Sequence, residues 1–252
     1  LPVLEAQASM PEMFVRRSYG RGPEEKRPTK ITRHFLDNVP GSCLIETGAT
    51  KVLCAVSIEE RVKAWRKGAG AGWITAEYAM LPASTAKRSS REHLTRKGRS
   101  MEIERLIGRS LRSAVDMTGL GGEVTFTVDC DVLQADGGTR TAAITGAWVA
   151  LHDALEMWQN AGKIKASPII DQVAAISVGQ VDGRILLDLD YQEDSRAEVD
   201  LNLVMNGRGE IIEVQGTGER CSFDRAKLDK MLDVATVGIE ELLAEQRRAI
   251  GE

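Results

Sequence analysis

Short apolar runs separated by turns dominate the first quarter of the chain. Residues 43–46 and 52–56 form two such runs, and the segment Thr47-Gly48-Ala49-Thr50 lies between them. This pattern predicts a β-hairpin. Farther along, apolar and polar residues alternate from Val124 to Val132, which predicts a strand with one buried face.

Helical spacing appears in three places. Apolar residues recur every three or four positions from Ser100 to Met117, where Ser100 can serve as the N-cap. A second helix is predicted from about Ala143 to Trp158, ending near Gly162. A third begins after Ser222 and continues to about residue 248.

Four more strands are predicted between the second and third helices, at residues 173–178, 185–189, 199–205 and 211–215. No internal repeat is evident. The order of strands and helices predicts an α/β chain of the α+β type, in which helices pack against mixed, largely antiparallel sheets.

Composition narrows the possible classes of protein. A chain of 252 residues with 42% hydrophobic residues can build one large domain or two small ones. Its apolar runs are shorter than the roughly 18 residues of a membrane-spanning helix, so no membrane partner is expected. Residues 1–9 lack the features of a secretory signal. Four widely spaced cysteines argue against a zinc site and favour reduced thiols in a cytoplasmic protein.

Charge is unevenly distributed, although the formal net charge is only −4. Residues 83–99 carry six basic side chains and one acidic side chain, a local balance of +5. Residues 188–200 carry six acidic side chains and one basic side chain, a local balance of −5. A basic patch can therefore exist on a protein that is acidic overall.

The alternating strand ends at a pair of glycines, Gly137 and Gly138, directly before the second helix. Free N–H groups and the positive end of the helix dipole meet at such a turn, which favours an anion. Thr139 adds a hydroxyl and Arg140 a guanidinium. An ordinary strand-to-helix turn with a surface arginine is the alternative. By contrast, the glycines of residues 67–72 favour a flexible loop over a dinucleotide-binding turn.

Four stretches, in order, carry a resemblance to a known family. Residues 130–142 read CDVLQADGGTRTA, and residues 72–78, 98–109 and 210–217 read GWITAEY, GRSMEIERLIGR and EIIEVQGT. The chain resembles the ribonuclease PH family over residues 27 to the last helix. This resemblance implies a single catalytic domain at 27–250. Residues 1–26 then form an N-terminal extension of unassigned role, with disorder as one alternative.

The resemblance implies a phosphorolytic exoribonuclease, a nucleotidyltransferase that uses inorganic phosphate as its co-substrate. Arg99, Gly138, Thr139 and Arg140 match the phosphate-binding positions, and Arg99 also counts as catalytic. Asp194 and Asp200 match catalytic positions near a divalent ion, expected to be Mg²⁺. Whether Asp194 is a general acid or a metal ligand stays open. Asp188, Asp190, Asp194, Glu198 and Asp200 share even parity, so one strand face could carry all five; for Asp188, Asp190 and Glu198 we expect a solvating role.

The same resemblance implies RNA contacts at Arg88 and Arg91, without base reading. Ala83 stands where relatives commonly carry Arg, so one RNA-facing charge is missing. The implied substrate is the 3′ end of tRNA precursors beyond the CCA sequence, and DNA is not expected. The implied assembly is a homohexameric ring, a trimer of dimers. A catalytically silent RNA-binding ring subunit is the alternative, against which the retained arginines and aspartates argue. The chain is too short for a polyribonucleotide phosphorylase.

Overall fold

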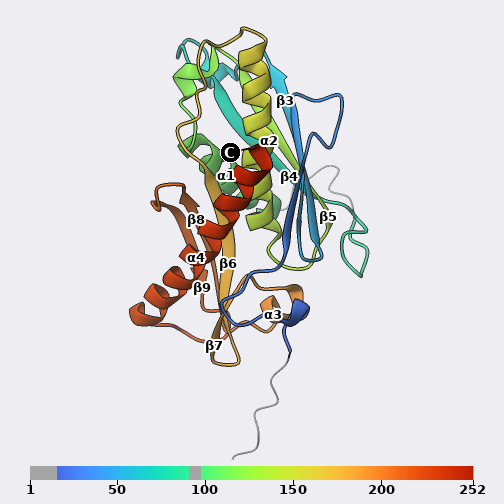
Figure 1. Cartoon of the computed structure of the whole chain (residues 1–252), viewed down its shortest axis with the longest axis vertical. Helices are drawn as coiled ribbons and strands as arrows, with labels where there is room; N and C mark the ends of the chain where they lie inside the picture. The colour runs from blue at the N-terminus through green and yellow to red at the C-terminus, as the bar shows by residue number, and fades with distance from the viewer. Residues whose placement is uncertain (1–15, 91–97, 252) are drawn as a thin grey trace, which may run out of the picture.

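A computed structural model describes residues 16–90 and 98–251. Two sheets and the helices between and beside them make up this part of the chain (Figure 1). Of the expected site residues, Arg91 lies outside the described residues.

The first sheet has five strands in the order β1-β2-β3-β5-β4. Its strands are β1 (Thr29–Arg33), β2 (Gly41–Thr47), β3 (Thr50–Glu59), β4 (Trp73–Met80) and β5 (Thr125–Gln134). Only β4 and β5 pair in parallel; the other neighbours are antiparallel. The predicted hairpin is confirmed, because β2 and β3 pair up to Thr47 and Thr50.

The second sheet has four antiparallel strands in the order β7-β6-β8-β9. Its strands are β6 (Val173–Val181), β7 (Arg184–Leu187), β8 (Val199–Asn206) and β9 (Ile211–Thr217). All four predicted strands are therefore present. The predicted strand at 185–189 ends two residues early, at Leu187.

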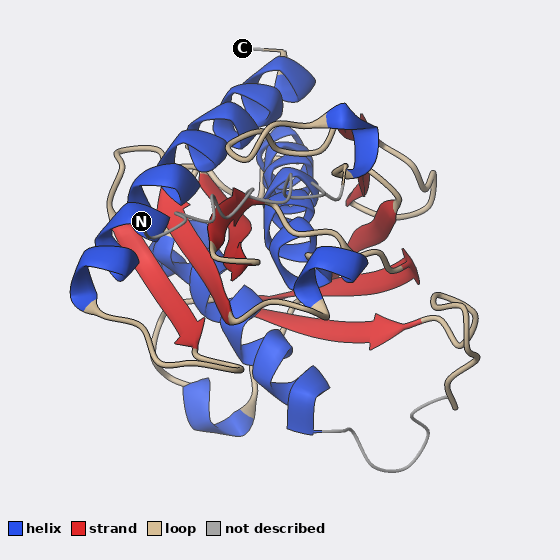
Figure 2. Ribbon diagram, turned by 90° about the horizontal axis from the view of Figure 1, so that it is seen from below, coloured by secondary structure: helices blue, strands red, loops and turns tan. Residues whose placement is uncertain are grey.

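Helix α2 (Thr139–Asn160) lies between the two sheets and contacts both. Sixteen of its 22 residues are buried, because strands cover opposite sides of it. Helix α1 (Gly98–Ser113) packs on β4, and α4 (Arg225–Ile250) packs on β6 and β8. Figure 2 shows α4, the long helix that ends near the C-terminus, lying beside strands.

Short helical turns complete the described elements: η1 (Ser18–Gly20), η2 (Ala64–Arg66), η3 (Met117–Leu120) and α3 (Tyr191–Asp194). The predicted helix start at Ser100 was two residues late, since α1 begins at Gly98 and Ser100 is buried within it. Cys43, Cys54 and Cys130 are buried and free, as expected, and Cys221 is exposed. Within the described ranges, no helix combines the length and apolar character of a membrane span.

Two corrections concern the acidic residues between 188 and 200. The acids do not share one strand face, because α3 interrupts the chain between β7 and β8. Asp188 and Asp190 do not solvate a surface: their exposed fractions are 3% and 7%. Residues 16–26, part of the expected N-terminal extension, pack against these buried acids: Arg17 forms an ion pair with Glu193, and Arg21 forms ion pairs with Asp188, Asp190 and Glu193.

Candidate active site

The turn between β5 and α2 has a backbone that only glycine adopts easily. Gly137 and Gly138 have φ angles of +75° and +64°. A Cβ atom on Gly137 would lie 2.5 Å from the carbonyl oxygen of Leu189, and one on Gly138 would lie 2.9 Å from Nη2 of Arg27. Both conformation and space therefore require glycine here.

Side chains from two other segments hold the carbonyl groups of this turn. Thr50 Oγ1 donates to the carbonyl oxygen of Gly137 at 2.7 Å and accepts from the N–H of Asp136 at 2.9 Å. Arg27 donates to the carbonyl oxygens of Asp136 and Gly137. The Asp136 carboxylate accepts from the N–H of Tyr191 at 3.4 Å, so it joins the turn to the start of α3.

Thr139, the first residue of α2, is buried and its hydroxyl lies 2.8 Å from the hydroxyl of Tyr78 on β4. Burial raises the pKa of Tyr78, and the neighbouring charges of Arg99 and Arg140 oppose that rise. The phenol is therefore neutral near pH 7. Tyr78 was not singled out from the sequence, although it closes the stretch 72–78 on which the resemblance rests.

Arg140 is held at its outer end by β9. Its Nη1 atom donates to Gln215 Oε1 at 3.0 Å and lies 3.6 Å from Glu102 Oε1 on α1. Gln215 also donates to Glu102 at 2.9 Å. Gln215 was likewise not singled out from the sequence, although it belongs to the stretch 210–217.

The carboxyl groups of Asp194 and Asp200 are influenced by the charge of Arg140, and Asp194 also by that of Arg99. Burial, and next the charge of Asp194, raise the pKa of Asp200 to about 6. Partial desolvation also raises the pKa of Asp194, against the charges of Arg99 and Arg140, although this residue is exposed at the surface. The charges of Arg99 on α1 and Arg140 on α2 thus act on Asp194 of α3, and those of Asp194 and Arg140 act on Asp200 of β8.

The predicted RNA contact at Arg88 is less closely tied to this cluster. Its side chain is exposed in the segment after β4, as is that of Ala83. An exposed position is compatible with a contact to an RNA backbone, so the role of Arg88 stays a prediction.

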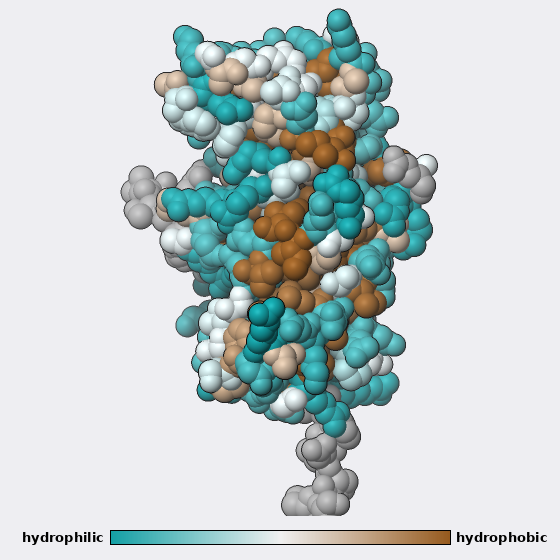
Figure 3. Space-filling view, turned by 90° about the vertical axis from the view of Figure 1, so that its left-hand side faces the viewer, coloured by the Kyte–Doolittle hydropathy of each residue, from teal (hydrophilic) through white to brown (hydrophobic). Residues whose placement is uncertain are grey.

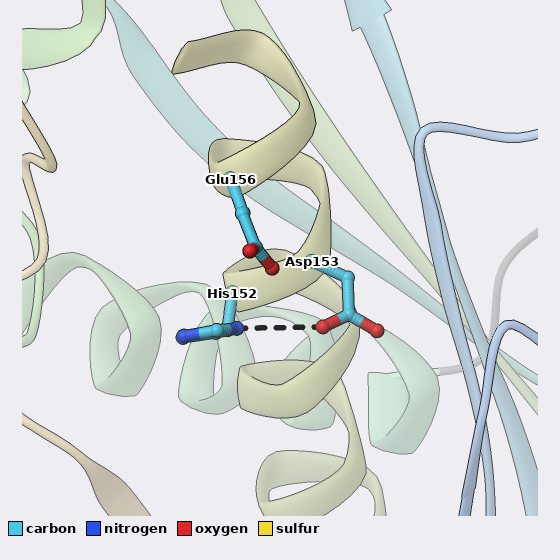
Figure 4. A group of neighbouring side chains, drawn as sticks. All are labelled: His152, Asp153 and Glu156. Carbon is cyan, nitrogen blue, oxygen red and sulfur yellow. Dashed lines mark hydrogen bonds and ion pairs between the residues drawn. The ribbon is translucent and has the colours of Figure 1, made fainter. Parts of the chain in front are cut away.

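A second group of possible ligand atoms lies on α2, at His152, Asp153 and Glu156 (Figure 4). Its ligand atoms lie within 4.8 Å of one another. However, Arg33 contacts both oxygens of Asp153, at distances down to 2.6 Å, and the Asp153 side chain is fully buried. An arginine already neutralises this carboxylate, so we assign the group to structure.

The chain matches the model of one protein family over most of its length. The model of the 3′ exoribonuclease family matches in two parts, domain 1 at residues 25–155 and domain 2 at residues 171–238. Together these ranges cover more than half of the chain. The chain therefore belongs to the 3′ exoribonuclease family.

Within that family the chain is similar to proteins named ribonuclease PH, which confirms the resemblance drawn from the sequence. It is 56% identical over 234 residues to ribonuclease PH of Corynebacterium glutamicum, covering 92% of this chain and 95% of the relative. It is 56% identical over 240 residues to that of Mycobacterium avium, covering 94% and 92%.

Solved structures agree on the fold. An Archaeoglobus fulgidus exosome chain, from a structure with RNA bound to the active site, superposes with a TM-score of 0.78 at 22% identity. The match covers 90% of this chain and 91% of that one. The predicted α+β class with an RNase PH-type fold is thus confirmed.

Proposed function

We propose that this chain is a phosphorolytic 3′ to 5′ exoribonuclease that trims tRNA precursors beyond their CCA end. One observation carries the proposal: Arg140, which follows the glycine turn in the first turn of α2, acts electrostatically on both Asp194 and Asp200, and Arg99 acts on Asp194. The names of its relatives support the same activity.

Inorganic phosphate would bind at Gly138, Thr139, Arg99 and Arg140. Two anionic phosphates must approach in line during the reaction, and fixed positive charge lowers their repulsion. An oxygen of inorganic phosphate attacks the terminal phosphorus, and the bond to the 3′ oxygen of the preceding nucleotide breaks. The products are a nucleoside diphosphate and an RNA shortened by one nucleotide.

The pair Asp194 and Asp200 fits a divalent cation such as Mg²⁺. Both side chains offer oxygen ligands. Their negative charges repel each other, and a bound divalent cation would relieve that repulsion. When bound, Mg²⁺ would neutralise charge on the reacting phosphates. Asp194 as a proton donor to the leaving 3′ oxygen is the alternative role.

Assembly into a ring, taken as a homohexamer built as a trimer of dimers, is part of this proposal. The edge strand β9 exposes Ile211 and Val214, at 52% and 39%. Figure 3 shows a band of apolar surface across the middle of one face of the molecule. Exposed apolar surface of this kind is typical of contacts between proteins. Sizing in solution checks the assembly.

The cytoplasm is the compartment that we propose, since three buried cysteines remain free.

Arg88 and Arg91 would contact the backbone of the tRNA body.

A 3′-extended tRNA incubated with Mg²⁺, with and without phosphate, tests the function. We expect trimming only with phosphate, and none by the Asp194→Asn variant purified in parallel. Equal trimming without phosphate would refute phosphorolysis. Full activity of Asp194→Asn would favour a silent ring subunit accompanied by a contaminating enzyme.

A further inference from the structure

Two peptide groups of the glycine turn are held by their carbonyl oxygens. Asp136 O accepts from Arg27 Nη1 at 2.5 Å, while Gly137 O accepts from Thr50 Oγ1 at 2.7 Å and from Arg27 Nη2 at 3.4 Å. In a planar trans peptide the N–H points opposite to the C=O. The N–H groups of Gly137 and Gly138 must therefore point away from Arg27 and Thr50.

The same two N–H groups lie just before α2. The N-cap residue of this helix is Gly138, which has no side chain to accept a hydrogen bond from them. Their direction is thus set by the groups behind the turn. A change of tens of degrees in either peptide plane would turn the donors away from a bound anion.

Arg27 is itself rigidly placed. It is fully buried and forms a bidentate pair with Asp188, at 3.0 Å from Nε to Oδ2 and 2.7 Å from Nη2 to Oδ1. Its own backbone N–H donates to Asp188 Oδ2 at 2.7 Å. Asp188 has a φ of +54°, a conformation that non-glycine residues adopt only when their surroundings enforce it.

Asp188 also connects this pair to a wider group of buried charges. Arg21 lies 4.0 Å from Asp188 and 3.3 Å from Glu193, and Arg17 lies 2.6 Å from Glu193. The segment from Arg17 to Arg27 therefore joins the second sheet to the turn.

We propose that Arg27 is a positioning residue for phosphate, which orients the N–H groups of Gly137 and Gly138 by binding the carbonyl oxygens on the opposite side. The inference rests on the proposed function, because phosphate is the ligand concerned. Arg27 does not serve as a further phosphate-binding charge, since Asp188 neutralises it.

Phosphate saturation of the wild type, Arg27→Gln and Arg27→Lys tests this role, with KM for phosphate, KM for RNA and kcat measured separately. We expect Arg27→Gln to raise KM for phosphate about tenfold or more, and to change KM for RNA less than about twofold. Arg27→Lys restores thermal stability but not the phosphate KM, because one ammonium cannot replace the guanidinium fork that serves Asp188 and two carbonyls.

Lys26→Gln is the matched control. Lys26 is the preceding residue, its side chain is only 8% exposed, and it pairs with Glu245 on α4 at 2.6 Å. Its loss should lower stability without changing the KM for phosphate. A phosphate KM that is unchanged in Arg27→Gln, or that is raised as much in Lys26→Gln, would overturn the inference.

Thr50 provides an independent test if the Arg27 variants do not fold. Thr50→Val should raise the KM for phosphate, whereas Thr50→Ser keeps the hydroxyl and should leave it near that of the wild type. Equal phosphate KM values for Thr50→Val and Thr50→Ser contradict the inference. A wild type that shows no dependence on phosphate refutes the proposed function itself, a result distinct from these.

Discussion

The hydroxyl groups of Tyr78 and Thr139 lie 2.8 Å apart in the interior, between β4 and the first turn of α2. A buried hydroxyl with one fixed partner can direct its remaining hydrogen-bonding capacity toward a ligand. In the proposed phosphate site we expect Tyr78 to set the direction in which Thr139 meets phosphate.

Replacing Tyr78 by Phe removes this hydrogen bond and leaves the ring in place. We expect the KM for phosphate to rise about fivefold, because one net hydrogen bond contributes about 1 kcal/mol. Phosphate saturation curves measure this, with Tyr19→Phe as the control at an exposed tyrosine. An unchanged KM would show that Thr139 needs no such orientation.

A comparison of Gly138→Ala with Gly183→Ala separates the effect of steric crowding from that of backbone strain. The added Cβ would meet Arg27 in a left-handed backbone, so we expect a loss of about 2 kcal/mol in the free energy of unfolding. The KM for phosphate should rise at least about tenfold. Gly183→Ala is the control, since its φ is +74° and nothing lies within 4 Å of its Cβ position. It should lose stability only, as denaturant unfolding and saturation curves can show.

Binding of Mg²⁺ should depend on Asp194 and Asp200. Either Asn variant should bind Mg²⁺ at least about tenfold more weakly than the wild type, as titration calorimetry can measure. Asp182→Asn, at an exposed carboxylate, should bind as the wild type does. Chelation should abolish trimming and added Mg²⁺ should restore it; full activity in chelator would exclude this metal role.

The carboxyl group of Asp153 should make the stability of the fold depend on pH. Burial alone would raise the pKa of Asp153, but hydrogen bonds with His152 and Arg33 hold it below its ordinary value. Because the folded-state pKa is lowered, the charged carboxylate stabilises the fold above about pH 4, and this contribution disappears as pH falls further.

Asp153→Asn should therefore cost about 3 kcal/mol at pH 7, since it leaves Arg33 without its buried partner. The difference from the wild type should shrink below about pH 4. Glu156→Gln, at an exposed carboxylate 3.6 Å from Arg33, should cost less than about 1 kcal/mol. A difference that stays constant with pH would contradict the assignment.

Local patterns predicted the elements well. The hairpin at Thr47 and Thr50, the alternating strand β5 and the buried helix α2 all follow from neighbouring residues. The glycine turn was also correctly placed, because a strand ending in two glycines before a helix is a local signal.

Contacts between distant segments were not predictable in this way. Asp188 pairs with Arg27, 161 positions away, and no spacing rule links them. The acidic residues between 188 and 200 were expected on one face of a strand, but α3 interrupts the chain there. Tyr78 was missed since its alternation with neighbours on β4 marks only a buried face, not a hydrogen bond to Thr139.

The central claim is that inorganic phosphate is the nucleophile, and the destination of labelled phosphate tests it most directly. A 3′-extended tRNA should be incubated with the wild type, Mg²⁺ and ³²P-labelled inorganic phosphate, and the released nucleotides separated. Phosphorolysis predicts label in the β-phosphate of nucleoside diphosphates, one for each nucleotide removed. Unlabelled nucleoside monophosphates would contradict it and show that water is the nucleophile.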